Sequence, residues 1–262
     1  MINTLTIGIV VFAVIFSSAL AGMKLSEYLP AHHLKNDTKD LVNVSTAVIA
    51  TISALVLGLL ISNANTNFSR IGGEVTTLSA SILRLDHILE EYGADAEPAR
   101  KMLLRFAEQK SVDLFPANPA NVRLNNLSTF ELHQRMLDMI LDLNPANPRD
   151  QWRREQALTL VARIGDTRWL LAEEGGHGTP MTFVALLVFW LALLFASFGL
   201  FAPHNPTAVV ILTLCALAVA AAVGMFLELE QGFGGLVRVS PQPMRQAVQI
   251  LQAHLERSGV GP

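Results

Sequence analysis

The chain has 262 residues, of which 51% are hydrophobic and only 16% are charged, whereas a soluble domain usually carries about 25% charged residues. The net charge of −3 gives no support for nucleic-acid binding, which requires a basic surface. A single cysteine, Cys215, excludes a disulfide framework within one chain, and Cys/His zinc spacing is absent.

Four uncharged segments are long enough to cross a membrane, because about 20 apolar residues in a helix span a hydrocarbon layer about 30 Å thick. These predicted spans cover residues 5–23, 43–64, 181–202 and 207–227. The small residues from Ser18 to Gly22 resemble a signal-peptidase site. The run before them lacks a basic region and is long for a signal peptide, so we expect a retained helix.

The second span carries small and polar residues on one helical face. They recur at spacings of three, four and seven: Thr51, Ala54 or Leu55, Gly58, Ser62 and Asn65. Two interpretations stay open at this point. Small residues allow close helix packing, with hydroxyls as hydrogen-bonding groups. Alternatively, the face lines an aqueous pore around a symmetry axis, where hydroxyls and amides can replace ion hydration.

The second span is followed by a heptad seam of apolar residues, spaced alternately by three and four and typical of a coiled-coil-like helix. The seam runs through Phe68, Ile71, Val75, Leu78, Ile82, Leu85, Leu89 and Tyr92. No proline interrupts residues 43–92, so span and seam are predicted to form one rod. The seam packs either on helices of its own domain or on neighbouring subunits.

The rest of the region between spans two and three also has helical patterns. Pro98 is expected to open one helix, to about residue 110; Ser128 to cap another with Glu131, in a capping box; and Asn147-Pro148 to open a third, ending near Glu174. Gly175-Gly176-His177-Gly178 is expected to end the third helix before span three.

Spans three and four are joined by Pro203-His204-Asn205-Pro206, which predicts a tight antiparallel hairpin with Thr207 as the cap of the second helix. Beyond span four, residues 232–235 contain three glycines and are expected to break the helix. A short extended stretch, 236–240, and an amphipathic helix from Pro243 follow. This helix is expected to dock on the domain or to lie at the membrane interface.

The even number of spans places both termini and residues 65–180 on one side of the membrane. Arginines near the span ends on that side are Arg70, Arg163, Arg168, Arg238 and Arg245. The lysines of the opposite side are partly offset by acids: Lys24, Lys35 and Lys39 against Glu27, Asp37 and Asp40. The positive-inside rule therefore favours a cytoplasmic domain.

No catalytic constellation is evident, so we expect neither an enzyme nor a cofactor. His32-His33 could bind a metal only with a third ligand that the sequence does not show, and His204 is expected to lie at the surface of its turn. Acids close to hydrocarbon are costly and often functional. Glu228 and Glu230, at the end of span four, belong either to an ion pathway or inter-subunit ion pair, or to the solvated interface.

Several segments together resemble a bacterial family of bestrophin-like membrane proteins over nearly the whole chain. They are Leu29-Pro30 with His32-His33, residues 54–68, Leu85-Asp86 with Tyr92-Gly93, Trp190 with residues 195–203, and residues 226–240. In that family a basic residue often stands where this chain has His87 and His204, and an aspartate and a proline near Glu230 and Gly232. The chain is similar, more remotely, to the bestrophins. That resemblance implies a pentameric ion channel with cytoplasmic termini, whose second span lines the pore.

The expected fold is all-α, with four transmembrane helices and a helical cytoplasmic domain inserted between helices 2 and 3. The predicted parts are 1–64 (helices 1 and 2), 65–180 (domain), 181–228 (helices 3 and 4) and 229–262 (C-terminal cytoplasmic segment). The predicted function is an oligomeric ion channel of the bacterial inner membrane, with anion conduction slightly favoured. The alternative is a non-conducting scaffold or sensor that binds a protein partner through its domain. The expected pore-lining residues are Thr51, Leu55, Gly58, Leu59, Ser62, Asn63 and Asn65.

Overall fold

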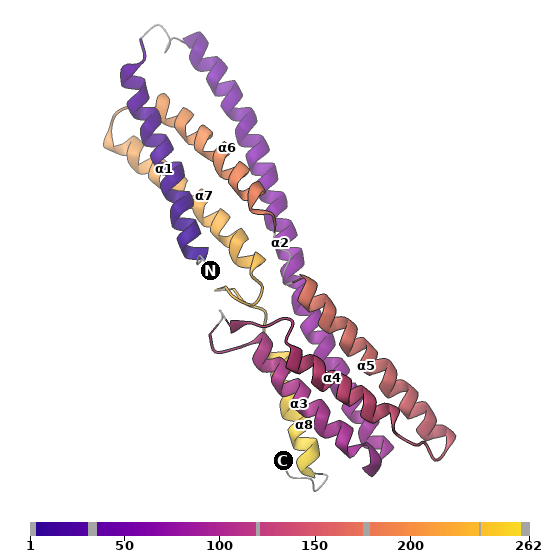
Figure 1. The fold of residues 1–262 in the computed structure, drawn as a ribbon. Helices are drawn as coiled ribbons and strands as arrows, with labels where there is room; N and C mark the ends of the chain where they lie inside the picture. Colours follow the sequence, from indigo (N-terminus) through magenta and orange to yellow (C-terminus); the bar gives the residue numbers. More distant parts are fainter. Residues whose placement is uncertain (1–3, 31–35, 119–120, 175–178, 236, 258–262) are drawn as a thin grey trace. The chain divides into compact units, whose positions relative to one another are not determined.

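The structure is a computed structural model that describes residues 4–30, 36–118, 121–174, 179–235 and 237–257. Within these ranges the chain forms eight α-helices and one 3-10 helix and no β-strand (Figure 1). The predicted all-helical class is therefore confirmed. Contacts divide the chain into two units, residues 1–66 with 178–230 (unit 1) and residues 67–177 with 231–262 (unit 2).

Unit 1 holds the helices that are long and apolar enough to cross a membrane. Four such helices occur in the described part of the chain. They are α1 (Thr4–Tyr28), α2 (Asn36–Tyr92, which continues into unit 2), α6 (Met181–Leu200) and α7 (Pro206–Glu230). Each predicted span lies within one of these helices or ends within two residues of it. Spans one and two are parts of longer helices.

Helices α1 and α6 cross in direct backbone contact. A Cβ atom added at Gly22 would lie 2.0 Å from the carbonyl oxygen of Ala196, and one added at Gly199 would lie 1.9 Å from that of Ala19. Only glycine fits at either position. Gly22, one of the small residues near the end of span one, thus serves helix packing, as small residues do at close crossings in membranes.

The connection between α6 and α7 is a tight turn, as predicted, but its cap is a different residue. Helix α7 begins at Pro206, and the side-chain oxygen of Asn205 accepts a hydrogen bond from the backbone N–H of Ala208 at 2.8 Å. Thr207, the expected cap, therefore lies inside the first turn. Proline suits the first helical position because its missing N–H would have no partner there.

Helix α2 is one uninterrupted helix of 57 residues, about 85 Å long at 1.5 Å per residue. This confirms the rod predicted over residues 43–92, and in the structure the helix already begins at Asn36. In unit 2 its seam is buried at Ile71, Val75, Leu78, Ile82, Leu85 and Leu89. These side chains share one hydrophobic core with residues of α3, α4, α5 and α8. The seam therefore packs on helices of its own chain.

Four further helices complete unit 2. The 3-10 turn η2 (Ala94–Ala96) leads into α3 (Glu97–Leu114), which is one turn longer than expected. Then come α4 (Leu127–Leu141), α5 (Pro148–Glu174) and α8 (Gln242–Arg257). Helix α8 docks on the unit through its apolar face, with Met244, Ala247, Leu251 and Leu255 buried.

The structure corrects the predicted cap of α4 in unit 2 and confirms the predicted end of the helix before residues 232–235. The N-cap of α4 is Asn126, whose side chain accepts from the backbone N–H and the hydroxyl of Ser128 at 3.2 and 2.9 Å. The expected capping box at Ser128 and Glu131 is therefore wrong. After α7, Gly232 takes a positive φ of 53°, and the N–H of Val239 donates to its carbonyl oxygen at 3.0 Å. The segment 175–178 and Leu236 lie outside the described residues.

Candidate functional site

The predicted pore-lining residues of α2 all share one property, which is that they are exposed in the single chain. Leu55 and Leu59 are 70% and 61% exposed. A Cβ atom added at Gly58 would meet nothing within 4 Å. The other members of the face are exposed as well: Thr51, Ser62, Asn63 and Asn65.

The opposite side of α2 is buried and also small or polar. Thr46, Ser53 and Ala64 are 7%, 2% and 0% exposed. Their separations of 7 and 11 residues are close to whole numbers of helical turns and place them on one side of the helix. Small side chains thus occur on both sides of α2, and packing within the chain uses this second side.

The polar groups of the exposed face can solvate ions of either sign. The hydroxyl of Thr51 donates to the carbonyl oxygen of Ala47 at 2.8 Å, so in this conformation its remaining outward groups are lone pairs and a methyl. The amides of Asn63 and Asn65 carry both donors and acceptors. The carbonyl oxygen of Ser62 accepts from the hydroxyl of Thr66 at 3.0 Å.

Glu230, one of the two acids at the end of α7, is bound to the segment that precedes α6. Its carboxylate accepts from the backbone N–H of Thr179 at 2.5 Å and from the hydroxyl of the same residue at 2.9 Å. A carboxylate is favourable beside a helix N-terminus. An ion pathway or inter-subunit pair at Glu230 would therefore have to compete with these two hydrogen bonds. Glu228 is half-buried.

Of the histidines noted in the sequence, His204 has defined contacts in the structure. His204 is fixed in the α6–α7 turn, because its Nε2 lies 3.1 Å from the carbonyl oxygen of Met23 and 3.5 Å from Oε1 of Glu27. His32 and His33 lie outside the described residues. Among the residues that the structure describes, no group of three His, Cys, Asp or Glu side chains is placed to hold a metal ion.

Unit 2 contains a buried ion pair that the sequence reading missed. Asp86 is 1% exposed and accepts from Nε of Arg100, itself 5% exposed, at 2.9 Å. The other carboxylate oxygen lies 2.9 Å from Nδ1 of His254, which joins α8 to α2. The sequence does contain a sign that Asp86 is buried, because Asp86 falls on the seam side of α2 between Ile82 and Leu89.

A second buried polar group surrounds Lys110 on α3. The side chain is fully buried and donates to the carbonyl oxygen of Leu124 at 3.0 Å. Burial lowers the pKa of Lys110 to about 8, against the opposing effect of the nearby Asp113. The carboxylate of Asp113 in turn accepts from Asn126 at 2.8 Å and from the hydroxyl of Thr129 at 2.5 Å. This network fixes the start of α4 on α3.

Arg168, counted above among the charges near a span end, is a buried cation. It is 2% exposed, and its guanidinium carbon lies 5.1 and 4.9 Å from the ring centroids of Phe130 and Trp169. Burial lowers its pKa, and the two rings compensate part of that cost through cation–π attraction. Arg168 is therefore a packing residue, and the membrane topology has to be argued from the other arginines.

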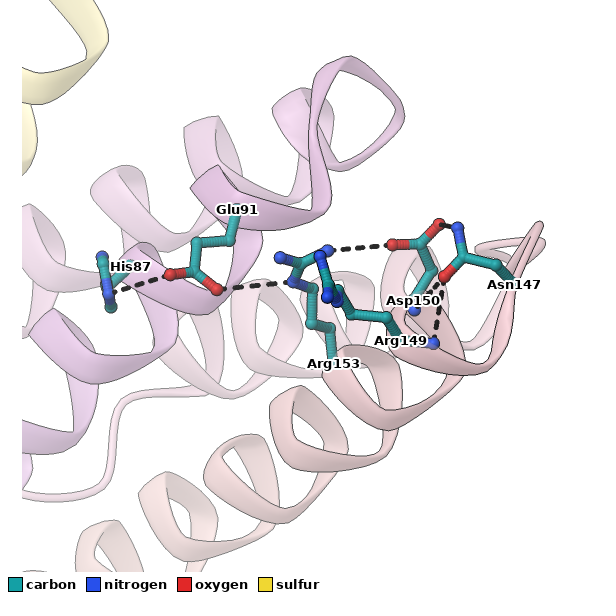
Figure 2. A network of polar contacts seen from close by, with 6 residues as sticks. All are labelled: His87, Glu91, Asn147, Arg149, Asp150 and Arg153. Carbon is teal, nitrogen blue, oxygen red and sulfur yellow. Dashed lines mark hydrogen bonds and ion pairs between the residues drawn. The ribbon is translucent and has the colours of Figure 1, made fainter.

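The end of α2 is joined to the start of α5 by a surface network (Figure 2). Glu91 lies 3.4 Å from both Nε2 of His87 and Nε of Arg153, and Arg153 lies 3.0 Å from Asp150. Asn147 donates to the same aspartate at 2.6 Å. His87 and Glu91 are 66% and 47% exposed, so ion pairs at this site contribute little stability. These contacts nevertheless give Glu91, at the end of α2, its own partners.

The fold defines an integral membrane protein with four apolar helices and a helical unit built around the extension of the second helix. The Bestrophin-like domain matches residues 12–244, which is most of the chain. The chain belongs to this Bestrophin-like family, and the resemblance read from the sequence is confirmed.

Solved structures share this fold at low sequence identity. Two variants of a bacterial Bestrophin homolog from Klebsiella pneumoniae, each 14% identical, give TM-scores of 0.61 and 0.59. They match 94% and 95% of this chain and 99% and 97% of their own chains. A crystal structure of a membrane protein, 13% identical, gives a TM-score of 0.66 over 97% of this chain and 99% of its own. A search of curated proteins gives no match.

Proposed function

We propose that this protein is an ion channel that assembles from several copies, expected to be five, with α2 lining the pore. The observation that supports this most is the exposed face of α2. Small, hydroxyl and amide side chains share that face with Leu55 and Leu59, which are 70% and 61% exposed in one chain. Membership of the Bestrophin-like family supports the same function.

In the proposed channel the leucines and the polar residues have different roles. Leu55 and Leu59 form a hydrophobic constriction that gates by dewetting. Ser62, Asn63 and Asn65 follow about one turn further along and stand at the cytoplasmic mouth, where they replace part of the ion's hydration shell. Anion conduction is slightly favoured.

The proposed orientation places unit 2 and both termini in the cytoplasm, with unit 1 in the bacterial inner membrane. It is supported by the arginines that flank the spans on that side: Arg70, Arg163, Arg238 and Arg245, all of which are exposed. Reporter fusions to the C-terminus, active only on one side of the membrane, test it. Activity on the outer side would refute the orientation.

Conductance of the purified protein in planar bilayers tests the function directly. Ser62→Leu should reduce single-channel current several-fold, because it replaces a hydroxyl on the pore face with a bulky apolar group. The matched control is Ser17→Leu, which makes the same change at an exposed position of a different helix, α1. It should leave the current unchanged. Leu59→Ser should increase the fraction of time the pore conducts, because it makes the constriction wettable.

The assembly is tested by particle symmetry in detergent or lipid nanodiscs. A ring of copies whose central axis passes beside α2 is required, since heterologous contacts that close make such rings. A monomer without flux in liposomes would refute the channel and favour the scaffold or sensor. Equal effects of Ser62→Leu and Ser17→Leu would refute the assignment of the face.

A further inference from the structure

The exposed face of α2 continues beyond the predicted membrane span with the same character. In unit 2 the exposed positions opposite the buried seam are Ser69, Gly73, Thr76 and Ala80. At about 100° per residue, each of them falls within about 40° of the direction of Ser62 on a regular helix. A pathway that follows the Ser62 face would therefore pass along small side chains for several further turns.

The next exposed position on this face is Arg84, and its charge is uncompensated. Positions three and four residues away on either side, which are 80, 81, 87 and 88, carry no acid. Among the described residues, no hydrogen bond or ion pair is formed by Arg84. The nearby acids of α2 have other partners, since Asp86 and Glu90 lie 2.9 and 3.6 Å from Arg100.

Glu91, the acid about two turns along α2 from Arg84, is also engaged elsewhere. It contacts His87 and Arg153 (Figure 2). Arg84 therefore presents a positive charge that these acids of α2 do not pair with. It follows the small residues of the face, and the described structure offers it no carboxylate.

We propose that Arg84 is the residue that gives the pore its preference for anions, acting as a ring of guanidinium groups repeated around the symmetry axis. The inference rests on the proposed function. Rings of Arg or Lys select anions in other pores, because charge of one sign in a confined passage raises the local concentration of counter-ions. The small residues before Arg84 leave the passage wide, so the charge acts on hydrated anions without binding them tightly.

The test is the reversal potential of the full-length channel in planar bilayers under a KCl gradient. Arg84→Glu should lower the chloride-to-potassium permeability ratio by about tenfold, whereas Arg84→Lys should keep it near the wild-type value. The matched control is Arg105→Glu, which makes the same charge reversal at an exposed position of α3 and should leave the ratio unchanged. The effect should shrink in 1 M salt, where the screening length falls to about 3 Å.

The outcomes separate this inference from the proposed function. A conducting Arg84→Glu channel with the wild-type permeability ratio would overturn the role of Arg84 and leave the channel intact. An equal shift in Arg105→Glu would also overturn it, because net charge and not position would then be responsible. A wild-type protein that carries no current would overturn both. Since Arg84 is exposed and unpaired, the unfolding temperature of the variants should match wild type, which excludes misfolding as the cause.

Discussion

Replacing Gly22 with alanine tests the contact between α1 and α6. The added Cβ atom would lie 2.0 Å from the carbonyl oxygen of Ala196 and 3.0 Å from the backbone nitrogen of Leu200. Both are backbone atoms of a helix and cannot move aside independently. The two helices must therefore separate by more than about 1 Å before the methyl group reaches an ordinary contact distance.

The cost follows from the contacts that this separation weakens. A radial gap of about 0.5–1 Å loses a quarter to a half of the attraction between each pair of packed atoms, and Ile15, Ala19, Leu194 and Phe195 are buried in α1 and α6 near the crossing. Overpacking of this kind usually costs about 1–3 kcal/mol. We expect Gly22→Ala to lower the free energy of unfolding by that amount.

Unfolding in mixed detergent micelles, followed by circular dichroism, measures the effect. Gly8→Ala is the matched control on the same helix, because its Cβ atom would meet nothing within 4 Å, and it should change stability by less than about 0.5 kcal/mol. Gly22→Ala combined with Gly199→Ala should cost less than the sum of the two, since both open one crossing. Equal stability of Gly22→Ala and Gly8→Ala would refute the close crossing.

Two further predictions concern buried charges of unit 2. Because burial lowers the pKa of Lys110 from 10.5 to about 8, the unfolded chain binds more protons between these values and stability should rise with pH across them. Wild type should gain about 3 kcal/mol over Lys110→Met in denaturant unfolding from pH 8 to 10.5, and a difference independent of pH would contradict the burial of the amine. Asp86→Asn removes the carboxylate beside the buried Arg100 and should cost about 3 kcal/mol in the same assay. Glu97→Gln removes the acid of an exposed pair, in which Oε1 of Glu97 lies 3.2 Å from Nζ of Lys101. It should cost less than about 1 kcal/mol, and equal losses for Asp86→Asn and Glu97→Gln would argue against a buried pair.

The features that could be predicted from the sequence are those that repeat along one helix. Uncharged runs identified the four long apolar helices, and the alternation of three and four residues identified the seam from Ile71 to Leu89. The exposed face around Ser62 could be proposed in the same way, because small and polar residues recur with the helical period. What covers that face depends on contacts outside one chain, so periodicity alone left both packing and a pore open.

Features that depend on contacts between distant residues could not be predicted. Asn126 and Ser128 are both good cap residues two positions apart, and only the backbone path decides which one caps α4. Lys110 is an ordinary charged residue in the sequence. It can be buried because a loop brings the carbonyl oxygen of Leu124 back to α3, where it accepts a hydrogen bond from the Lys110 amine. The burial of Asp86 depends on its contacts with Arg100 and His254, and His254 lies 168 residues away in the sequence.

The hydrogen bonds between Thr179 and Glu230 have a consequence for how the protein is made. They join Thr179, two residues before α6, to the last residue of α7, so the chain enters and leaves this pair of helices at one point. The junction can form only after both helices have been inserted, because only then do the start of α6 and the end of α7 lie at the same face of the bilayer. Hydrogen bonds to a charged group contribute about 1.5–3 kcal/mol. These hydrogen bonds therefore stabilise the pair of helices only once both are in place.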